Sequence, residues 1–310
     1  MGVLVFLPLV LPLTTWPVAR RAEQRLHPRI ATWLLSVSAG VLAVCSTVCL
    51  ALVMVVGTAQ LPGNPLPDGW SDPEVRQAVP CDQVAGRAAI PALVAVLVAC
   101  GRVVWQHRRV RRRAEQALVG LPGTGSVAVL RDDVPYAYAL PGRRGRVVVS
   151  RGMLSRLERA ERRALFAHER AHLASSHHRF LLVVGVAARA NPFLVPVRTA
   201  VAYSVERWAD EEAAAVVGSR RVVARAIGRA ALVSRGAPAG TLAAFSAPGP
   251  VPRRVAALLA PAPAAGGWSS VLTAVGPATW TAAVGTAVSA LASVNSAVTL
   301  FLVLKAATPL

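Results

Sequence analysis

The sequence predicts a mainly α-helical membrane protein, with about four transmembrane helices and a cytoplasmic α+β domain that carries a small β-sheet. Of the 310 residues, 54% are hydrophobic and only 16% are charged, whereas soluble domains have about a quarter charged residues. Long uncharged runs alternate with arginine-rich segments. This alternation divides the chain into spans and loops.

The N-terminal region, residues 1–105, is expected to contain three transmembrane segments. The first, residues 3–18, is apolar but interrupted by prolines, and arginines follow it. That order favours a short span with the N-terminus outside, and a cleaved signal peptide is the alternative. The second, residues 30–57, has no charged residue, and about 20 apolar residues can cross a bilayer. The third, residues 88–105, contains one late arginine that can reach a headgroup.

The loops predict the orientation of these segments. Residues 20–29 and 106–113 are strongly basic, whereas residues 61–83 are rich in Pro and Gly and net acidic. The positive-inside rule places the two basic loops in the cytoplasm. Residues 106–265 then form a cytoplasmic domain, and residues 266–310 provide a fourth span rich in small residues. We therefore expect a multi-pass plasma-membrane protein.

The cytoplasmic region is expected to combine strands and helices. Three strands are expected, at residues 125–130, 136–145 and 146–150. Helical spacing begins at Met153 and predicts two consecutive helices. Residues 180–203 are apolar but contain arginines and prolines, which favours two short helices, buried or against the membrane. A full fifth span is the alternative, and it would place the acids that follow outside. Residues 237–267 are rich in Ala, Pro and Gly and predict a linker.

The net charge of +19 comes almost entirely from arginine, because Lys305 is the only lysine. The arginines cluster beside apolar runs and form no recognisable nucleic-acid-binding module. They favour contact with the anionic cytoplasmic face of a lipid bilayer, and no nucleic-acid partner is expected. Cys81 lies in a polar loop, the other three cysteines lie in apolar runs, and no CxxC pair predicts a disulfide framework or a cysteine zinc site. His27 and His107 lie in basic loops and are expected to be solvated.

The residues that carry chemistry lie in the stretch ALFAHERAHLASSHHRF, residues 164–180, which holds four of the six histidines. His168, Glu169 and His172 form the spacing H-E-x-x-H. Residues four apart share a helix face, so both imidazoles can bind one zinc ion while Glu169 takes a proton from water. A solvated polar helix is the alternative, but so few His and Glu residues rarely give this spacing by chance.

A catalytic zinc site needs a third protein ligand. After His172 the only acids lie in YSVERWADEEAAAVV, a helical stretch. Glu206 and Asp210 are four apart, so they can supply one ligand and one acceptor for a ligand histidine. Glu211 and Glu212 are expected to face solvent. An ordinary cluster of charges is the alternative for Glu206.

The remaining histidines of the stretch are poorly placed to bind the same ion. His177 lies five residues after His172, about 140° around the helix. We expect His177 to support the site rather than to bind metal, and we assign His178 no role. Tyr203 is a candidate to stabilise the oxyanion, only because it is near Glu206 in the chain.

The motifs AHERAH and ERWAD resemble those of gluzincin membrane peptidases, which include the HtpX-type and CaaX-prenyl proteases. The stretch YAYALPGRRGRVVVSRGMLSRLERAERRALFAHERAH is more similar to the BlaR and MecR sensor-transducers. The resemblance implies a zincin-like fold and one Zn²⁺ per chain held by His168, His172 and Glu206. It also implies Glu169 as general base, Asp210 as support, and a peptide-binding strand beside the cleft.

The sequence departs from the BlaR and MecR pattern in two ways. Those proteins often have an aspartate at the position of His177. They also carry a penicillin-binding sensor domain after the fourth span, whereas this sequence has no S-x-x-K motif. Direct sensing of a beta-lactam is therefore not expected.

These patterns predict an integral membrane zinc endopeptidase that cleaves a protein or peptide substrate at the cytoplasmic membrane face. A cognate repressor is one candidate substrate. Two alternatives stay open: a non-catalytic zinc-binding signalling or scaffold protein, and a zinc hydrolase acting on lipids or small molecules. The sequence leaves the activating signal and the oligomeric state open.

Overall fold

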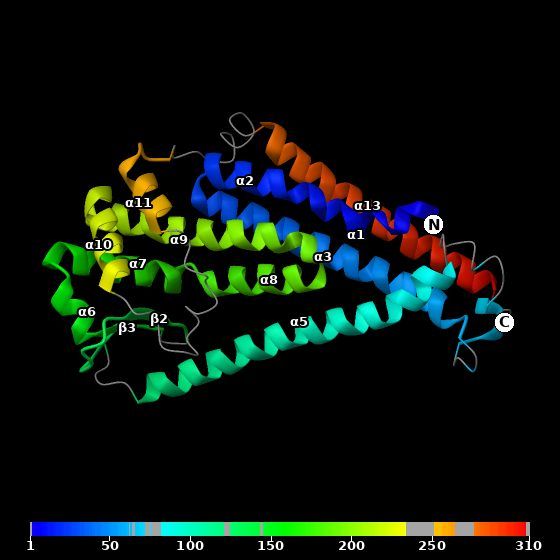
Figure 1. The fold of residues 1–310 in the computed structure, drawn as a ribbon, viewed down its shortest axis with the longest axis horizontal. Coiled ribbons are helices and arrows are strands. Elements are labelled where there is room, and N and C mark those ends of the chain that lie inside the picture. Colours follow the sequence, from blue (N-terminus) through cyan, green and yellow to red (C-terminus); the bar gives the residue numbers. More distant parts are fainter. Residues whose placement is uncertain are drawn as a thin grey trace.

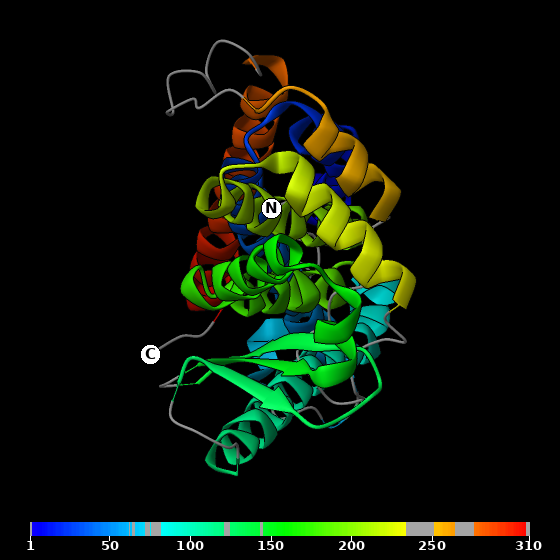
Figure 2. The ribbon, with the colours of Figure 1, turned by 90° about the vertical axis from the view of Figure 1, so that its left-hand side faces the viewer.

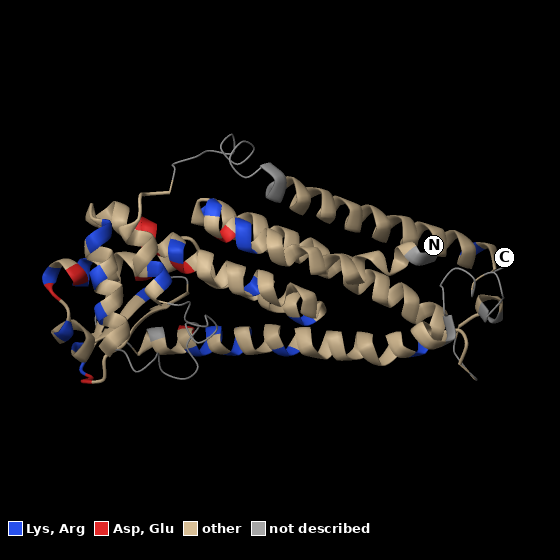
Figure 3. Ribbon diagram, turned by 45° about the horizontal axis from the view of Figure 1, so that its top comes forward, with Lys and Arg blue, Asp and Glu red and all other residues tan. Residues whose placement is uncertain are grey.

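Long helices run along the length of the molecule, and a small sheet with several shorter helices lies at one end (Figure 1). The structure is a computed structural model that describes residues 2–61, 63, 66–71, 75, 82–120, 125–142, 145–233, 251–263 and 276–307. Charged residues are frequent in the ribbon at the sheet end, whereas the long helices are largely uncharged over much of their length (Figure 3). Cys81 and most of the expected acidic loop lie outside the described residues.

Three helices in the described part of the chain are long and apolar enough to cross a membrane. They are α3 (Pro28–Thr58), α5 (Asp82–Val119) and α13 (Gly276–Ala306). They match the second, third and fourth expected spans. Exposed Val94, Leu97 and Val98 line the outer face of α5, as expected for a surface that meets lipid.

The first expected span, residues 3–18, is not among these candidate helices. It folds as short helical pieces: η1 (Gly2–Val5), α1 (Leu7–Val10), η2 (Leu11–Thr14) and the beginning of α2 (Thr15–Arg25). Proline has no backbone N–H, so Pro12 cannot bond the carbonyl of Pro8. The hydroxyl of Ser46 on α3 donates to that carbonyl instead, at 2.7 Å.

The central helix of the bundle is α3, which contacts α5, α8, α9 and α13. Its crossing with α5 is very close at Gly57 and Gly86, where a Cβ built on Gly57 would lie 2.2 Å from the carbonyl carbon of Gly86. Small residues at a crossing let two apolar helices approach in this way. This contact fixes one end of α5, and the other end reaches the sheet.

The sheet has three strands in the expected positions, in the order β1-β3-β2. They are β1 (Val127–Leu130), β2 (Ala137–Leu140) and β3 (Arg146–Ser150). β3 pairs parallel with β1 and antiparallel with β2, and every residue of β3 is buried. The sheet lies between α7 and the end of α5 (Figure 2). β2 is consequently an edge strand next to α7.

The helices after the sheet form the site end of the molecule. They are α6 (Arg151–Arg156), α7 (Arg159–Ala174), α8 (His177–Ala190), η4 (Pro192–Leu194), α9 (Val195–Val217) and α10 (Arg220–Val233). As expected, residues 180–203 lie in two helices, and these meet at Asn191. The second is longer than expected and continues to Val217. The Asn191 amide donates to the carbonyl of Leu9 and to the Ser46 hydroxyl, each at 3.0 Å. Because the chain turns back here, α9 returns to the side of α7.

The interpretation of residues 237–267 as a linker was wrong for its centre. Residues 251–259 form α11 (Val251–Leu259), which packs against α9 and α10. Its buried face includes Arg254 and Leu258. The Ala, Pro and Gly content predicted a linker, but the apolar spacing within this short stretch suffices for a helix once α9 and α10 cover one face.

Candidate metal centre

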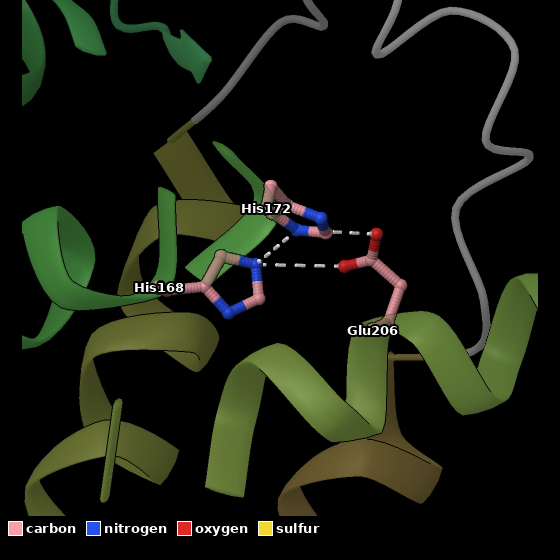
Figure 4. Close-up of side chains that lie close together, drawn as sticks. All are labelled: His168, His172 and Glu206. Atoms are coloured by element: carbon pink, nitrogen blue, oxygen red, sulfur yellow. Dashed lines mark hydrogen bonds and ion pairs between the residues drawn. The ribbon is translucent and has the colours of Figure 1, made fainter. Parts of the chain in front are cut away.

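Three side chains from two helices meet at the sheet end of the bundle (Figure 4). His168 and His172 come from α7 and Glu206 from α9, and their ligand atoms all lie within 4.8 Å of one another. The two Nε2 atoms are 3.1 Å apart. Glu206 places Oε2 3.6 Å from Nε2 of His168 and Oε1 3.6 Å from Nε2 of His172.

Local structure explains why these groups converge. The four-residue spacing on α7 stacks the two imidazoles on one face. The beginning of α7 is fixed because the backbone N–H of Glu158 donates to Glu161 at 2.9 Å. The turn at Asn191 brings α9 back along α7. Glu206 therefore faces both histidines although it lies far from them in the sequence.

His168 is oriented by a buried carboxylate. Its Nδ1 lies 3.0 Å from Oδ1 of Asp210, whose side chain is 0% exposed. Burial disfavours a charged imidazole, but the nearby carboxylates of Asp210 and Glu206 outweigh this and raise the pKa of His168 to about 10. Because Nδ1 faces the carboxylate, Nε2 is the nitrogen that faces His172 and Glu206. The structure thus brings Asp210 to its expected place.

His172 is oriented in turn by His177. Their Nδ1 atoms lie 2.9 Å apart. If Nε2 of His172 is to bind a cation, its Nδ1 must carry the proton and donate to Nδ1 of His177. His177 then has its proton on Nε2, and its ring packs against Trp208 at 4.6 Å between centroids. Burial is the main cause that lowers the pKa of His177 to about 2 and that of His172 to about 4, so both imidazoles are neutral near pH 7.

Arg254 of α11 completes the group, and sequence reasoning missed it. Its Nε and Nη2 donate to the two carboxylate oxygens of Asp210 at 2.9 and 2.6 Å. Its Nη1 lies 2.8 Å from Oε2 of Glu206. The side chain is only 9% exposed. One guanidinium therefore holds both carboxylates of the site in a fixed relation.

The carboxylates of the site are ionised although they are buried. Burial alone favours the neutral acid. Arg254 and then His172 hold the pKa of Glu206 well below its usual range. Arg254 and His168 likewise lower the pKa of Asp210. Both acids can consequently act as anionic ligands or acceptors near neutral pH.

Glu169 lines a cleft of about 530 Å³ together with His168, His172 and Glu206. Burial raises the pKa of its carboxyl. A raised pKa makes a carboxylate a stronger base. Glu169 is not part of the convergent group of three, so it is placed to act on a molecule in the cleft.

The neighbouring candidates have different positions. Tyr203 does not line the cleft, and the guanidinium of Arg253 covers its ring at 4.5 Å. Glu211 was expected to face solvent but accepts from Arg207 at 2.7 Å and from Arg220 at 2.9 Å, tying α9 to α10. Glu212 is exposed, as expected.

The donor set fits a zinc ion. Tetrahedral zinc with bonds of about 2.0–2.1 Å holds neighbouring ligand atoms about 3.3 Å apart. The Nε2–Nε2 distance of 3.1 Å and the two Nε2–carboxylate distances of 3.6 Å lie close to that value. Each histidine has its other nitrogen on a fixed partner, which is typical of metal-binding histidines.

Residues 102–190 match the model of Peptidase family M48. The match includes the H-E-x-x-H motif and ends before Glu206. Peptidases of this family are metal-dependent, typically on zinc, so the match supports a metallopeptidase in a chain with helices able to cross a membrane. No curated protein and no solved structure matches the chain. The more specific BlaR and MecR assignment stays a prediction.

Proposed function

We propose that the protein is an integral membrane zinc endopeptidase with one Zn²⁺ per chain. The observation that carries this proposal is the convergence of His168, His172 and Glu206 within 4.8 Å, beside a glutamate that lines the same cleft. Three protein ligands leave a fourth position open, as in catalytic zinc sites. No cysteine of the described chain lies in the cleft to close the coordination shell.

Bound zinc would polarise the scissile carbonyl and lower the pKa of water toward about 7. Glu169 accepts a proton as the water oxygen bonds to the carbonyl carbon. It returns that proton to the amine nitrogen when the C–N bond breaks. The raised pKa of Glu169 favours proton uptake from water, because it makes the carboxylate a stronger base.

The free edge of β2 is evidence that the substrate is a peptide. Ala137, Tyr138, Ala139 and Pro141 line the cleft. β2 pairs with β3 on one side only among the described strands. An extended peptide can therefore add to the other edge through main-chain hydrogen bonds. This would place a scissile bond beside Glu169.

We further propose that cleavage takes place at the cytoplasmic face of the plasma membrane, and that it serves regulatory proteolysis of a repressor or a membrane protein. The basic loops at residues 20–29 and 106–113 lie before the span at 30–57 and after the span at 88–105. They support that orientation through the positive-inside rule. The resemblance to BlaR and MecR supports the regulatory role. The arginines at this end of the molecule suit an anionic membrane face.

Zinc content and cleavage of a casein-like probe test the proposal on detergent-purified chain. Wild type should hold one zinc and cleave. Glu169→Gln should keep zinc and lose at least about 100-fold in activity, because the proton acceptor is gone. Glu206→Gln should lose zinc. Glu212→Gln, an exposed change on the same helix, should keep both properties.

Three results would overturn parts of this proposal. Wild type without zinc, or Glu206→Gln with normal zinc content, contradicts the metal site. A Glu169→Gln variant with normal cleavage contradicts the general base. Zinc binding without cleavage of any probe favours the non-catalytic signalling or scaffold function.

A further inference from the structure

A second cavity, of about 140 Å³, lies between α5, α8 and the beginning of α9. Its polar lining comes from all three helices: Gln106 and His107 of α5, His178 and Arg189 of α8, and Arg198 of α9. His107 was expected to be solvated, but it is 7% exposed, and its ring stacks on that of His178 at 5.7 Å and 15°. The cavity is therefore built from groups that can donate hydrogen bonds.

The charge around this cavity is uncompensated. Among the described residues no acid lines it, and residues 84–114 and 173–205 contain no Asp or Glu. Arg189 and Arg198 are exposed and form no ion pair with any described residue. Burial is the main cause that lowers the pKa of His178 to about 4, so the two arginines carry the positive charge near pH 7.

The position of the cavity along α5 indicates what kind of anion reaches it. Val103 and Gln106 stand where the apolar run of α5 ends, and arginines become dense from Arg108 onward. In a helix that crosses a membrane, this change marks the boundary between lipid chains and water. The phosphate groups of phospholipids lie at that level.

We propose that this cavity binds a phosphate group between Arg189 and Arg198, as the headgroup of an anionic phospholipid or as free phosphate. Guanidinium groups form paired, charge-assisted hydrogen bonds with phosphate oxygens. Gln106 and the two imidazoles add donors. The site does not depend on the proposed peptidase activity, although His178 and Leu181 line both this cavity and the cleft.

Lipid binding to the full-length chain in detergent tests the proposal. Phosphatidylglycerol is titrated, and the bound lipid is counted by native mass spectrometry. The double variant Arg189→Gln/Arg198→Gln should bind about 30-fold more weakly, at about fivefold for each arginine near a phosphate. The matched control is Arg112→Gln/Arg113→Gln, which removes the same charge from exposed positions of α5 outside the cavity. It should bind within about twofold of wild type.

Two further probes separate the sources of phosphate. Phosphatidylglycerol bound more tightly than inorganic phosphate identifies a lipid headgroup. Inorganic phosphate that displaces the lipid identifies a soluble anion in the same site. The proposal is overturned if neither probe binds, or if both double variants lose binding equally, because the attraction is then diffuse. Equal binding of phosphatidylglycerol and phosphatidylcholine by wild type also overturns it, because the arginines then select no anionic headgroup. Zinc content is measured on each variant, so a folding defect is recognised separately.

Discussion

Arg254 offers the sharpest test of how the site is held together. Arg254→Lys keeps the positive charge but removes the planar fork that contacts Asp210 through two atoms and Glu206 through a third. A lysine ammonium on a similar stem can reach one carboxylate. Two of the three contacts are then lost while the net charge of the site is unchanged. The change therefore isolates positioning from electrostatic neutralisation.

The size of the effect follows from these contacts. A hydrogen bond between charged groups contributes about 1.5–3 kcal/mol. Relaxation around the lysine recovers part of two such bonds, so we expect the unfolding free energy to fall by about 3 kcal/mol. Removing a partner of a buried charge pair costs about 3–5 kcal/mol, so Arg254→Met should lower the unfolding free energy further. Because Asp210 and Glu206 lose their common partner, zinc affinity should fall about tenfold or more.

Both quantities can be measured on purified chain. The unfolding free energy comes from denaturant titration in detergent followed by tryptophan fluorescence, and zinc affinity from competition with a chelator. Arg225→Lys is the matched control, because Arg225 is an exposed arginine of α10. Wild-type stability and zinc affinity in Arg254→Lys would refute the view that the guanidinium fork positions the carboxylates.

Three further predictions follow from the site and from the turn between α8 and α9. Zinc affinity should rise about tenfold per pH unit between about pH 6 and about pH 8, because the metal displaces a proton from His168, whose pKa in the metal-free protein is raised to about 10. Chelator competition at several pH values checks this, and a pH-independent affinity would contradict it. His177→Phe keeps a ring against Trp208 but removes the acceptor for His172, so zinc affinity should fall about tenfold. Unchanged zinc affinity in the same competition assay would show that His177 only fills space. In a chain without native cysteines, Arg156→Cys and Leu232→Cys should react with an impermeant maleimide from the same side of the membrane, because α8 and α9 turn back. Labelling from opposite sides would mean that this apolar segment spans the bilayer.

Much of the site could be predicted because its chemistry depends on local spacing. Residues four apart on one helix necessarily share a face, so spacing alone pairs His168 with His172, and Glu206 with Asp210. The joining of the two pairs was also predictable. His168, His172 and Glu206 can share one ion only if the apolar stretch at residues 180–203 does not cross the membrane. Asn191 and Pro192 supply the turn that brings the chain back.

The parts that could not be predicted depend on contacts between distant segments. Residues 3–18 have the composition of a span, but their prolines free carbonyls that need partners on α3 and at Asn191. His107 lies in an arginine-rich segment, yet it is buried because α8 packs over it. Composition describes what a segment can do alone, whereas these outcomes depend on which neighbour covers it.

The need for a cation such as Arg254 beside the two carboxylates could have been predicted from the sequence. Two carboxylates assigned to one buried site carry two negative charges, and one protonated histidine can offset only one of them when the metal is absent. Buried charges of this kind require a partner. After Asp210 the sequence has seven arginines, four of them in α10 and two in VPRRVAALL, a short amphipathic stretch. The demand for a cation therefore existed in the sequence, but the structure had to show which arginine meets it, namely Arg254.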